Sequence, residues 1–92
     1  MINDVAIECI CDYIRDLEQE QSVVKESYEF QAYSFKIWAA RELIRRLDIS
    51  SKDILDILAS FVNEMEMYAV QSDNIAFPIA RDAAEDIALL FV

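Results

Sequence analysis

The sequence predicts an all-α protein, a small antiparallel helical bundle of about four helices in a single domain spanning residues 1–92. Apolar residues recur three and four positions apart along almost the whole chain, the spacing of one face of an α-helix. No segment alternates cleanly with the period of a strand, and no Asn-Gly or Asp-Gly pair occurs to favour a hairpin. A chain of 92 residues that is 55% hydrophobic can fill one core.

The first helix is expected over about residues 4–20, with Asn3 as its N-cap. Its inner face should consist of Val5, Cys9, Tyr13, Ile14 and Leu17. Residues 21–25 show the weakest helical pattern, so they should connect the first two helices, with Ser22 or Ser27 as a cap.

The second helix is expected over about residues 27–47, and a second apolar row beside its seam indicates a central helix with more than one neighbour. The seam is Phe30, Tyr33, Ile37, Ala40, Ile44 and Leu47, and the second row is Phe35, Trp38 and Leu43. Aromatic residues at this spacing, Trp38 included, are more typical of a core than of a stacking platform.

The third helix is expected to follow a capping box in which Ser50 is the N-cap and Asp53 stands at N3, with Ile49 and Ile54 as a hydrophobic staple. Its seam should be Leu55, Leu58, Phe61, Val62, Met65, Tyr68 and Ala69. Polar residues 71–74 then break the pattern.

The last helix should begin between Asn74 and Pro78, because proline is tolerated in a first turn. Its inner stripe should be Ile79, Ala80, Ala83, Ile87 and Leu90. Short connections favour an up-and-down bundle, and a three-helix core with one peripheral helix is the alternative. The consecutive apolar residues at the C-terminus, which cannot all face one core, predict either a homodimer seam or a tucked-in end; they are Leu89, Leu90, Phe91 and Val92.

Composition excludes several kinds of chemistry. Without Gly there is no phosphate-binding loop, and without His there is no Ser-His or Cys-His pair and no usual zinc or di-iron ligand set. Glu26 with Glu29, and Asp53 with Asp56, resemble the paired acids of all-α nucleoside triphosphate pyrophosphatases. They open successive antiparallel helices, however, and so should lie about 30 Å apart. We therefore expect no enzyme, no metal site and no cofactor, with a Mg²⁺-dependent nucleotide hydrolase as a weaker alternative.

The N-terminal residues are acidic, where a secretory signal or a transit peptide would be basic, and no apolar stretch approaches the roughly 18 residues of a membrane span. Cys9 and Cys11 point to different sides of a helix, so they should not bridge each other. We expect two small buried hydrophobic residues in a reducing compartment, with a reactive or metal-binding pair as the alternative. The sequence therefore predicts a cytoplasmic protein.

The formal charge of −10 is unevenly distributed. Residues 1–35 hold eight acidic and two basic residues (−6), residues 36–52 hold two and five (+3), and residues 53–92 hold eight and one (−7). Acidic residues at every fourth position form a row along the first helix, and three more lie on the outer face of the last helix. They are Asp4, Glu8, Asp12, Asp16 and Glu20, and then Asp82, Glu85 and Asp86.

These carboxylates allow two interpretations. They can be a solvated face that keeps the protein soluble. Alternatively they can dock on a basic, nucleic-acid-binding surface of another protein, because a row of one sign attracts one class of partner. Successive carboxylates in the row rise about 6 Å along the helix, a scale comparable to that of nucleic-acid phosphates. Direct binding to nucleic acid is disfavoured by the same negative field.

The second half of the chain, about residues 54–92, resembles short helical proteins encoded on bacterial prophages and mobile elements. The resemblance rests on Asn-Glu-Met-Glu-Met-Tyr at 63–68 and on the run from Ala76 to Ile87. It implies a genetic setting in which small acidic proteins often inhibit host nucleases, including CRISPR effectors. The leading hypothesis is therefore an acidic, DNA-mimicking inhibitor of the anti-CRISPR kind, with a homo-oligomeric structural or regulatory bundle as the alternative.

Overall fold

The computed structural model describes residues 3–91 and confirms the all-α class. It contains α1 (Asp4–Ser22), α2 (Ser27–Ile49), α3 (Ile54–Gln71), α4 (Ala76–Ala88) and a final 3-10 turn, η1 (Leu89–Phe91). Residues 3–91 include no strand. Within this part of the chain no helix is long and apolar enough to cross a membrane.

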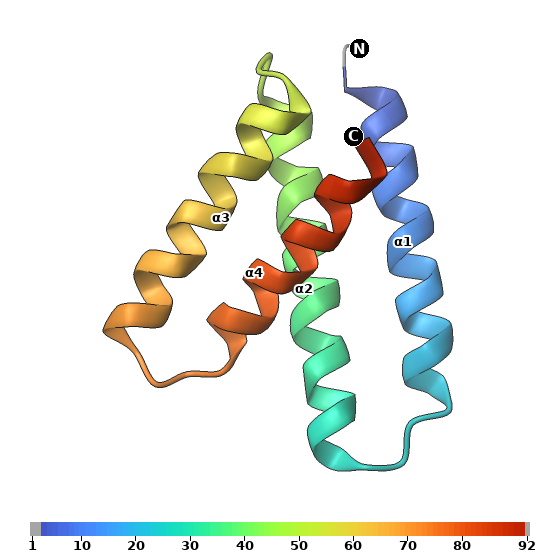
Figure 1. Cartoon of the computed structure of the whole chain (residues 1–92). Helices are drawn as coiled ribbons and strands as arrows, with labels where there is room; N and C mark the ends of the chain where they lie inside the picture. Colours follow the sequence, from blue (N-terminus) through green and yellow to red (C-terminus); the bar gives the residue numbers. More distant parts are fainter. Residues whose placement is uncertain (1–2, 92) are drawn as a thin grey trace.

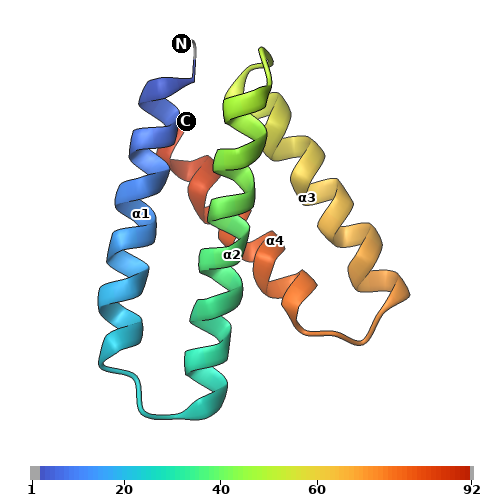
Figure 2. The same cartoon turned by 180° about the vertical axis from the view of Figure 1, so that it is seen from behind.

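The helices form two antiparallel hairpins, α1 with α2 and α3 with α4 (Figure 1). Helix α4 lies obliquely across α2, and α3 is splayed away from α2 on the side opposite to α1 (Figure 2). Helix α2 contacts each of the other three helices, which confirms its expected central position. The oblique α4 also brings the C-terminal turn close to α1 (Figure 1).

The core lies between α2, α4 and the inner faces of α1 and α3. Its largest fully buried side chains are Ile10, Leu43, Leu47, Phe61, Met65 and Ile87. Small residues with no exposed surface occur on both helices that cross, namely Ala39 and Ala40 on α2 and Ala80, Ala83 and Ala84 on α4. Small side chains allow two helix axes to approach closely, so α2 and α3 can both pack against α4.

The inner faces of α1 and α3 differ from those expected. Helix α1 buries Ala6, Ile10, Ile14 and Leu17, whereas Val5 is 74% exposed. Helix α3 buries Ile57, Leu58, Phe61 and Met65, whereas Leu55 and Tyr68 are exposed. Apolar character alone does not distinguish between two apolar rows that have the same helical spacing. The positions of the neighbouring helices decide which of these rows is buried.

The aromatic residues of α2 also lie farther from the core than expected. Phe30 is exposed, and Tyr33 and Phe35 are half-buried. Trp38 is 46% exposed, although its ring packs against Phe61 with the ring centroids 6.5 Å apart. Only the C-terminal half of α2 is covered on several sides, because α3 and α4 meet it there.

The loop between α1 and α2 lies where it was expected, but its cap is different. Neither Ser22 nor Ser27 caps α2. Instead, the Glu26 carboxylate accepts hydrogen bonds from the backbone N–H groups of Tyr28 (3.0 Å) and Glu29 (2.8 Å). A carboxylate at this position also interacts favourably with the positive end of the helix dipole.

Asn3 precedes α1 as expected but does not cap it through its side chain. Its buried amide instead donates to three backbone carbonyls at the end of α2 and in the following loop: those of Leu47 (3.2 Å), Ser50 (3.3 Å) and Lys52 (3.2 Å). The side chain therefore ties the beginning of the chain to the α2–α3 connection.

The expected capping box of α3 is wrong. Helix α3 begins at Ile54, and the Asp53 side chain makes no cap hydrogen bond. The Ser50 hydroxyl accepts from the N–H of Lys52 (3.1 Å), which forms a local turn, and Ile49 is exposed rather than part of a staple. Because α2 continues to Ile49, Ser50 ends one helix and stands too far from the next to cap it.

The polar break after Gln71 and the start of α4 at Ala76 agree with the expectation. The apolar C-terminus divides: Phe91 packs against the core, whereas Leu89 is 73% and Leu90 53% exposed. Val92 lies outside the described residues. Leu90 is therefore not part of the inner stripe of α4, and the end of the chain is only partly tucked in.

Candidate partner-binding surface

The five carboxylates of the α1 row are all exposed, but they do not share one face of the helix. Each step of four residues rotates by about 40°, so the row turns by about 160° from its first member to its last. Asp4 borders the C-terminal end of α2, where it lines a cavity with Asp48 and Ile49. Glu20 lies beside Tyr33 of α2 on the other flank.

Little of the negative charge of Glu8, Asp12, Asp16 and Glu20 is compensated. Asp12 pairs with Arg15 at 3.0 Å, and both side chains are mostly exposed, a setting in which an ion pair contributes about 0–1 kcal/mol. Glu8, Asp16 and Glu20 form no ion pair within residues 3–91. The middle and end of the row therefore keep a net negative charge.

The three acidic residues of α4 are also exposed, and they divide into two groups. Asp82 and Glu85 lie near Arg81, with N–O distances of 3.2 and 4.0 Å. Asp86 has no ion-pair partner within residues 3–91, and its charge acts on Tyr13 of α1. Asp86 is thus the α4 carboxylate that adds to the negative potential beside α1.

A cavity of about 300 Å³ lies between α1 and the C-terminal turn. We call it the Tyr13 pocket, and its lining residues are Cys9, Asp12, Tyr13, Asp16 and Leu90. The pocket joins two groups of residues that the sequence suggested as separate sites, the acidic row and the apolar C-terminus. The oblique course of α4 brings them together, because it places η1 beside α1 (Figure 1).

Tyr13 reports the electrostatic environment of this pocket. Burial, together with the carboxylates of Asp86 and then Glu20, raises the pKa of Tyr13 to about 12. Burial and nearby carboxylates oppose the formation of a phenolate, since each disfavours a further negative charge. The carboxylates near Tyr13 therefore disfavour an anion and favour a cation, whereas the burial of Tyr13 disfavours a charge of either sign.

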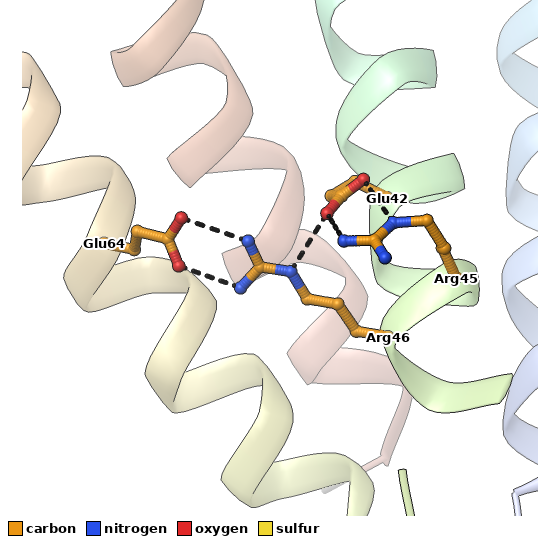
Figure 3. Close-up of polar contacts among 4 residues, drawn as sticks. All are labelled: Glu42, Arg45, Arg46 and Glu64. Carbon is orange, nitrogen blue, oxygen red and sulfur yellow. Dashed lines mark hydrogen bonds and ion pairs between the residues drawn. The ribbon is translucent and has the colours of Figure 1, made fainter. Parts of the chain in front are cut away.

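A second cluster of charges lies between α2 and α3, and its charges balance (Figure 3). The Arg46 guanidinium donates through both Nη atoms to Glu64 of α3, at 3.0 and 3.1 Å, and through Nε to Glu42 at 3.2 Å. Arg45 donates to the same Glu42 at 2.6 and 3.1 Å. The Arg46 guanidinium also lies 5.0 Å from the centre of the Phe61 ring. We call these five residues the Arg46 cluster.

The hydrogen bonds from Arg45, opposed by partial burial and reinforced by Arg46, lower the pKa of Glu42 below its ordinary value. The cluster pairs two of the four basic residues of α2, Arg45 and Arg46, and a third, Arg41, pairs with Glu18 of α1 at 3.6 Å. All five arginines of the chain, at positions 15, 41, 45, 46 and 81, therefore lie next to carboxylates. No concentrated basic surface remains on α2.

The candidate metal ligands and the cysteines do not form a clustered metal site within the described residues. Residues 3–91 contain no group of three or more Cys, Asp or Glu side chains placed to hold a metal ion. The paired acids at Glu26 and Asp53 stand at opposite ends of α2, whose 23 residues span about 34 Å. Cys9 and Cys11 are free thiols and are half-buried and exposed, respectively, so the expectation of two buried cysteines is wrong.

Comparison of the chain with protein-family models, with curated proteins and with solved structures found no significant match.

Two elements of these sites were missed from the sequence. Tyr13 was assigned to the inner face of the first helix, but the side chain stands at its edge among carboxylates. Its position directly after Asp12 and three residues before Asp16 was the available signal. The contact between Arg46 and Glu64 had no such signal, because it depends on the angle at which α3 leaves α2.

Proposed function

We propose that this protein is a non-enzymatic interaction protein that binds a basic, nucleic-acid-binding surface of another protein and blocks it. A nuclease, including a CRISPR effector, is the class of partner that the resemblance to prophage-encoded proteins suggests. We place this interaction in the cytoplasm, with no cofactor and no direct contact to nucleic acid.

The main support is the group of exposed carboxylates without an ion pair within residues 3–91, namely Glu8, Asp16 and Glu20 on α1 and Asp86 on α4. The arginines are held by internal ion pairs, so the net charge of −10 resides in exposed acidic side chains. Such a field attracts a cationic surface over a long range and accelerates association at low salt. The like-charged row gives the isolated helix no advantage, since each i,i+4 pair costs about 0.2–0.5 kcal/mol.

The alternative is a homo-oligomer that assembles through the exposed Leu89 and Leu90. Its difficulty is electrostatic, because Leu90 shares its pocket with Asp12 and Asp16. Two copies that meet there would place their carboxylates against each other, which destabilises the contact. Removal of residues 90–92 followed by sedimentation analysis tests this alternative: a fall from dimeric to monomeric mass would support it.

The weaker alternative, a Mg²⁺-dependent nucleotide hydrolase, has no clustered ligands within residues 3–91. A calorimetric titration with Mg²⁺ tests it directly. Heat of binding with a one-to-one stoichiometry would revive it, and the absence of such heat would remove it.

Charge reversal tests the proposed function. Glu8, Asp12 and Asp16 are changed together to Lys, and the tagged protein is used to capture basic nucleic-acid-binding proteins from a bacterial lysate at low and high salt. Each captured protein is then assayed for duplex-DNA binding in the presence of the wild-type chain. We expect wild-type protein to inhibit DNA binding and the triple variant to lose both capture and inhibition.

A matched control separates the position of the charge from its amount. Asp56, Glu66 and Asp73 are exposed acids of α3 and the loop after it, and their reversal to Lys changes the net charge equally. This control should retain capture and inhibition. Equal loss in both variants would show attraction by net charge alone, and retention in the α1 variant would contradict the proposed surface. Circular dichroism of both variants should show unchanged helix content.

A further inference from the structure

We infer that the Tyr13 pocket receives a single basic side chain, an arginine or a lysine, from the protein partner. The inference rests on the proposed function and adds to it the point at which the partner is anchored.

The size of the pocket fits one side chain. Its volume of about 300 Å³ lies at the lower end of the roughly 300–1,000 Å³ found for small-molecule sites. It is open on the surface between α1 and η1, where a side chain of another protein can enter. A single long side chain therefore matches the pocket better than a cofactor.

The lining has the two kinds of surface that a basic side chain requires. The Tyr13 ring, Leu90 and Cys9 offer an apolar wall for the aliphatic stem of the side chain. Arginine and lysine bury this stem against apolar surface while their charged ends stay in contact with water or polar groups. The carboxylates of Asp12 and Asp16 are placed to accept hydrogen bonds from the cationic end. Asp16 has no ion pair within residues 3–91, and Asp12 shares its charge with Arg15 alone.

The charges around the pocket select the sign of the ligand. The groups that act on Tyr13 from the neighbouring helix and from its own helix are Asp86 and Glu20, and both are negative. Arg15 is the basic residue nearest in sequence, and its guanidinium donates to the Asp12 carboxylate at 3.0 Å, while Arg15 itself does not line the pocket. An entering cation therefore meets the lining carboxylates of Asp12 and Asp16, and the charges of Asp86 and Glu20 add to the negative potential at Tyr13.

The Arg46 cluster is the same arrangement with its cation in place. There, a guanidinium lies 5.0 Å from the centre of an aromatic ring and is held by carboxylates from two helices (Figure 3). The Tyr13 pocket has the ring and the two α1 carboxylates of Asp12 and Asp16 in its lining, and the charge of Asp86 on α4 acts on Tyr13 although Asp86 does not line the pocket. No cation lies over Tyr13 within residues 3–91. A partner's arginine would complete it in the way that Arg46 completes the other cluster.

A second copy of this chain is a less favourable occupant. Its acidic surface would bring carboxylates to a pocket that already carries Asp12 and Asp16. An apolar ligand without charge would leave the carboxylates uncompensated next to it. The charge of the pocket thus favours a cationic side chain over both.

The inference is tested with an octapeptide of alternating arginine and glycine, and with the same peptide in which citrulline replaces arginine. Citrulline keeps the shape of the side chain and removes its charge. Affinities for the full-length protein are measured by calorimetry at low salt. We expect binding of the arginine peptide and at least a tenfold weaker response to the citrulline peptide.

Paired variants locate the binding within the pocket. Leu90→Gln removes an apolar wall, and Leu89→Gln changes the adjacent, more exposed residue, which does not line the pocket. Tyr13→Leu removes the ring, and Tyr13→Phe keeps it. We expect Leu90→Gln and Tyr13→Leu to weaken arginine-peptide binding by about fivefold, while Leu89→Gln and Tyr13→Phe leave it within about twofold.

Cys9 supplies a local readout. In a Cys11→Ser variant, Cys9 is the sole thiol, and its rate of alkylation by neutral iodoacetamide reports occupancy of the pocket that it lines. We expect the arginine peptide to slow alkylation of Cys9 several-fold and not to slow that of Cys11 in the matched Cys9→Ser variant. A general effect of positive charge would instead favour both thiolates and speed both reactions.

The outcomes separate the pocket from the proposed function. If charge reversal at Glu8, Asp12 and Asp16 abolishes peptide binding but Leu90→Gln, Tyr13→Leu and Cys9 protection show no effect, the acidic surface stands and the pocket is overturned. If the citrulline and arginine peptides bind alike, the pocket is apolar rather than cation-selective, and the inference also fails. If neither set of variants affects binding, the proposed surface fails with it.

Discussion

The Arg46 cluster and the Tyr13 pocket both place charged groups around an aromatic ring, and they differ in charge balance. In the Arg46 cluster, two arginines face two carboxylates between α2 and α3. Near Tyr13 there are three carboxylates, those of Asp12, Asp16 and Asp86, and Arg15 forms an ion pair with Asp12 only. The first cluster links α2 and α3 through ion pairs, whereas the second leaves Asp16 and Asp86 without an ion-pair partner within residues 3–91. The same residue types thus have different consequences, depending on whether the fold supplies the counter-charge.

Removing Arg46 should have the largest effect on stability. Arg46→Ala breaks two hydrogen bonds to Glu64 and one to Glu42, and it leaves the partly buried Glu64 without its ion-pair partner, whereas Glu42 keeps Arg45. We expect the free energy of unfolding to fall by about 2 kcal/mol in urea denaturation. The matched control is Arg45→Ala, whose side chain is largely exposed and whose loss should cost less than about 1 kcal/mol. Equal losses would show that the cluster contributes only surface charge.

Removing the amide of Asn3 should have the next largest effect. Asn3→Ala leaves the carbonyls of Leu47, Ser50 and Lys52 without this donor and loosens the contact between the first turn and the α2–α3 loop. We expect a loss of about 1–2 kcal/mol by thermal and urea unfolding. Asn63→Ala, on the exposed side of α3, is the control and should not destabilise the protein. An unaffected Asn3→Ala variant would mean that water replaces the amide without loss.

Neutralising carboxylates of the α1 row should have a small effect in the opposite direction. Glu8→Gln with Asp16→Asn removes like charges at i,i+4 spacing, and neither residue has an ion pair within residues 3–91. We expect the free energy of unfolding to stay constant or to rise by up to about 0.5 kcal/mol, with the gain decreasing at high salt. A clear loss of stability would show that these carboxylates stabilise the folded state. It would contradict the difference between the α1 row and the Arg46 cluster.

The smallest effect concerns the ionisation of Tyr13 and is invisible at neutral pH. The pKa of Tyr13 is raised to about 12, above its ordinary value of 10. Between these two pH values Tyr13 keeps its proton in the folded state and loses it in the unfolded state. Stability should therefore fall as the pH rises from 10 towards 12. Asp86→Asn should lower the pKa of Tyr13, as followed by phenolate absorbance, with Tyr13→Phe identifying its transition. Asp82→Asn is the control and should leave that transition in place.

The sequence was informative about local structure where the pattern was local. The all-α class, the central position of α2, the loop after α1 and the start of α4 all follow from apolar spacing and from polar breaks. The caps were less accurate, because Asn3 and Ser50 had alternative hydrogen-bond partners in the α2–α3 connection and its turn. Short polar side chains bond to whichever backbone group lies nearest, and that is set by the fold.

The candidate site was predictable in composition but not in shape. Acidic spacing along the first helix identified exposed carboxylates, and their exposure in the structure agrees with that expectation. Leu90 lines the same pocket as Tyr13, Asp12 and Asp16. Residue spacing could not predict this, because the path of α4 brings Leu90 to α1. Whether the surface binds a partner remains a prediction for the experiments above.

What the sequence alone determined is the number of helices over the described residues, the negative charge and the absence of Gly and His, because these depend on spacing and composition. What only the tertiary structure decided is which charges are neutralised. Helix α4 crosses α2 on buried alanines and carries the C-terminal turn to the Tyr13 pocket, and the splayed α3 leaves Glu64 within reach of Arg46. Charge pairing depends on distances of a few ångströms between helices, and those distances follow from packing rather than from the order of residues.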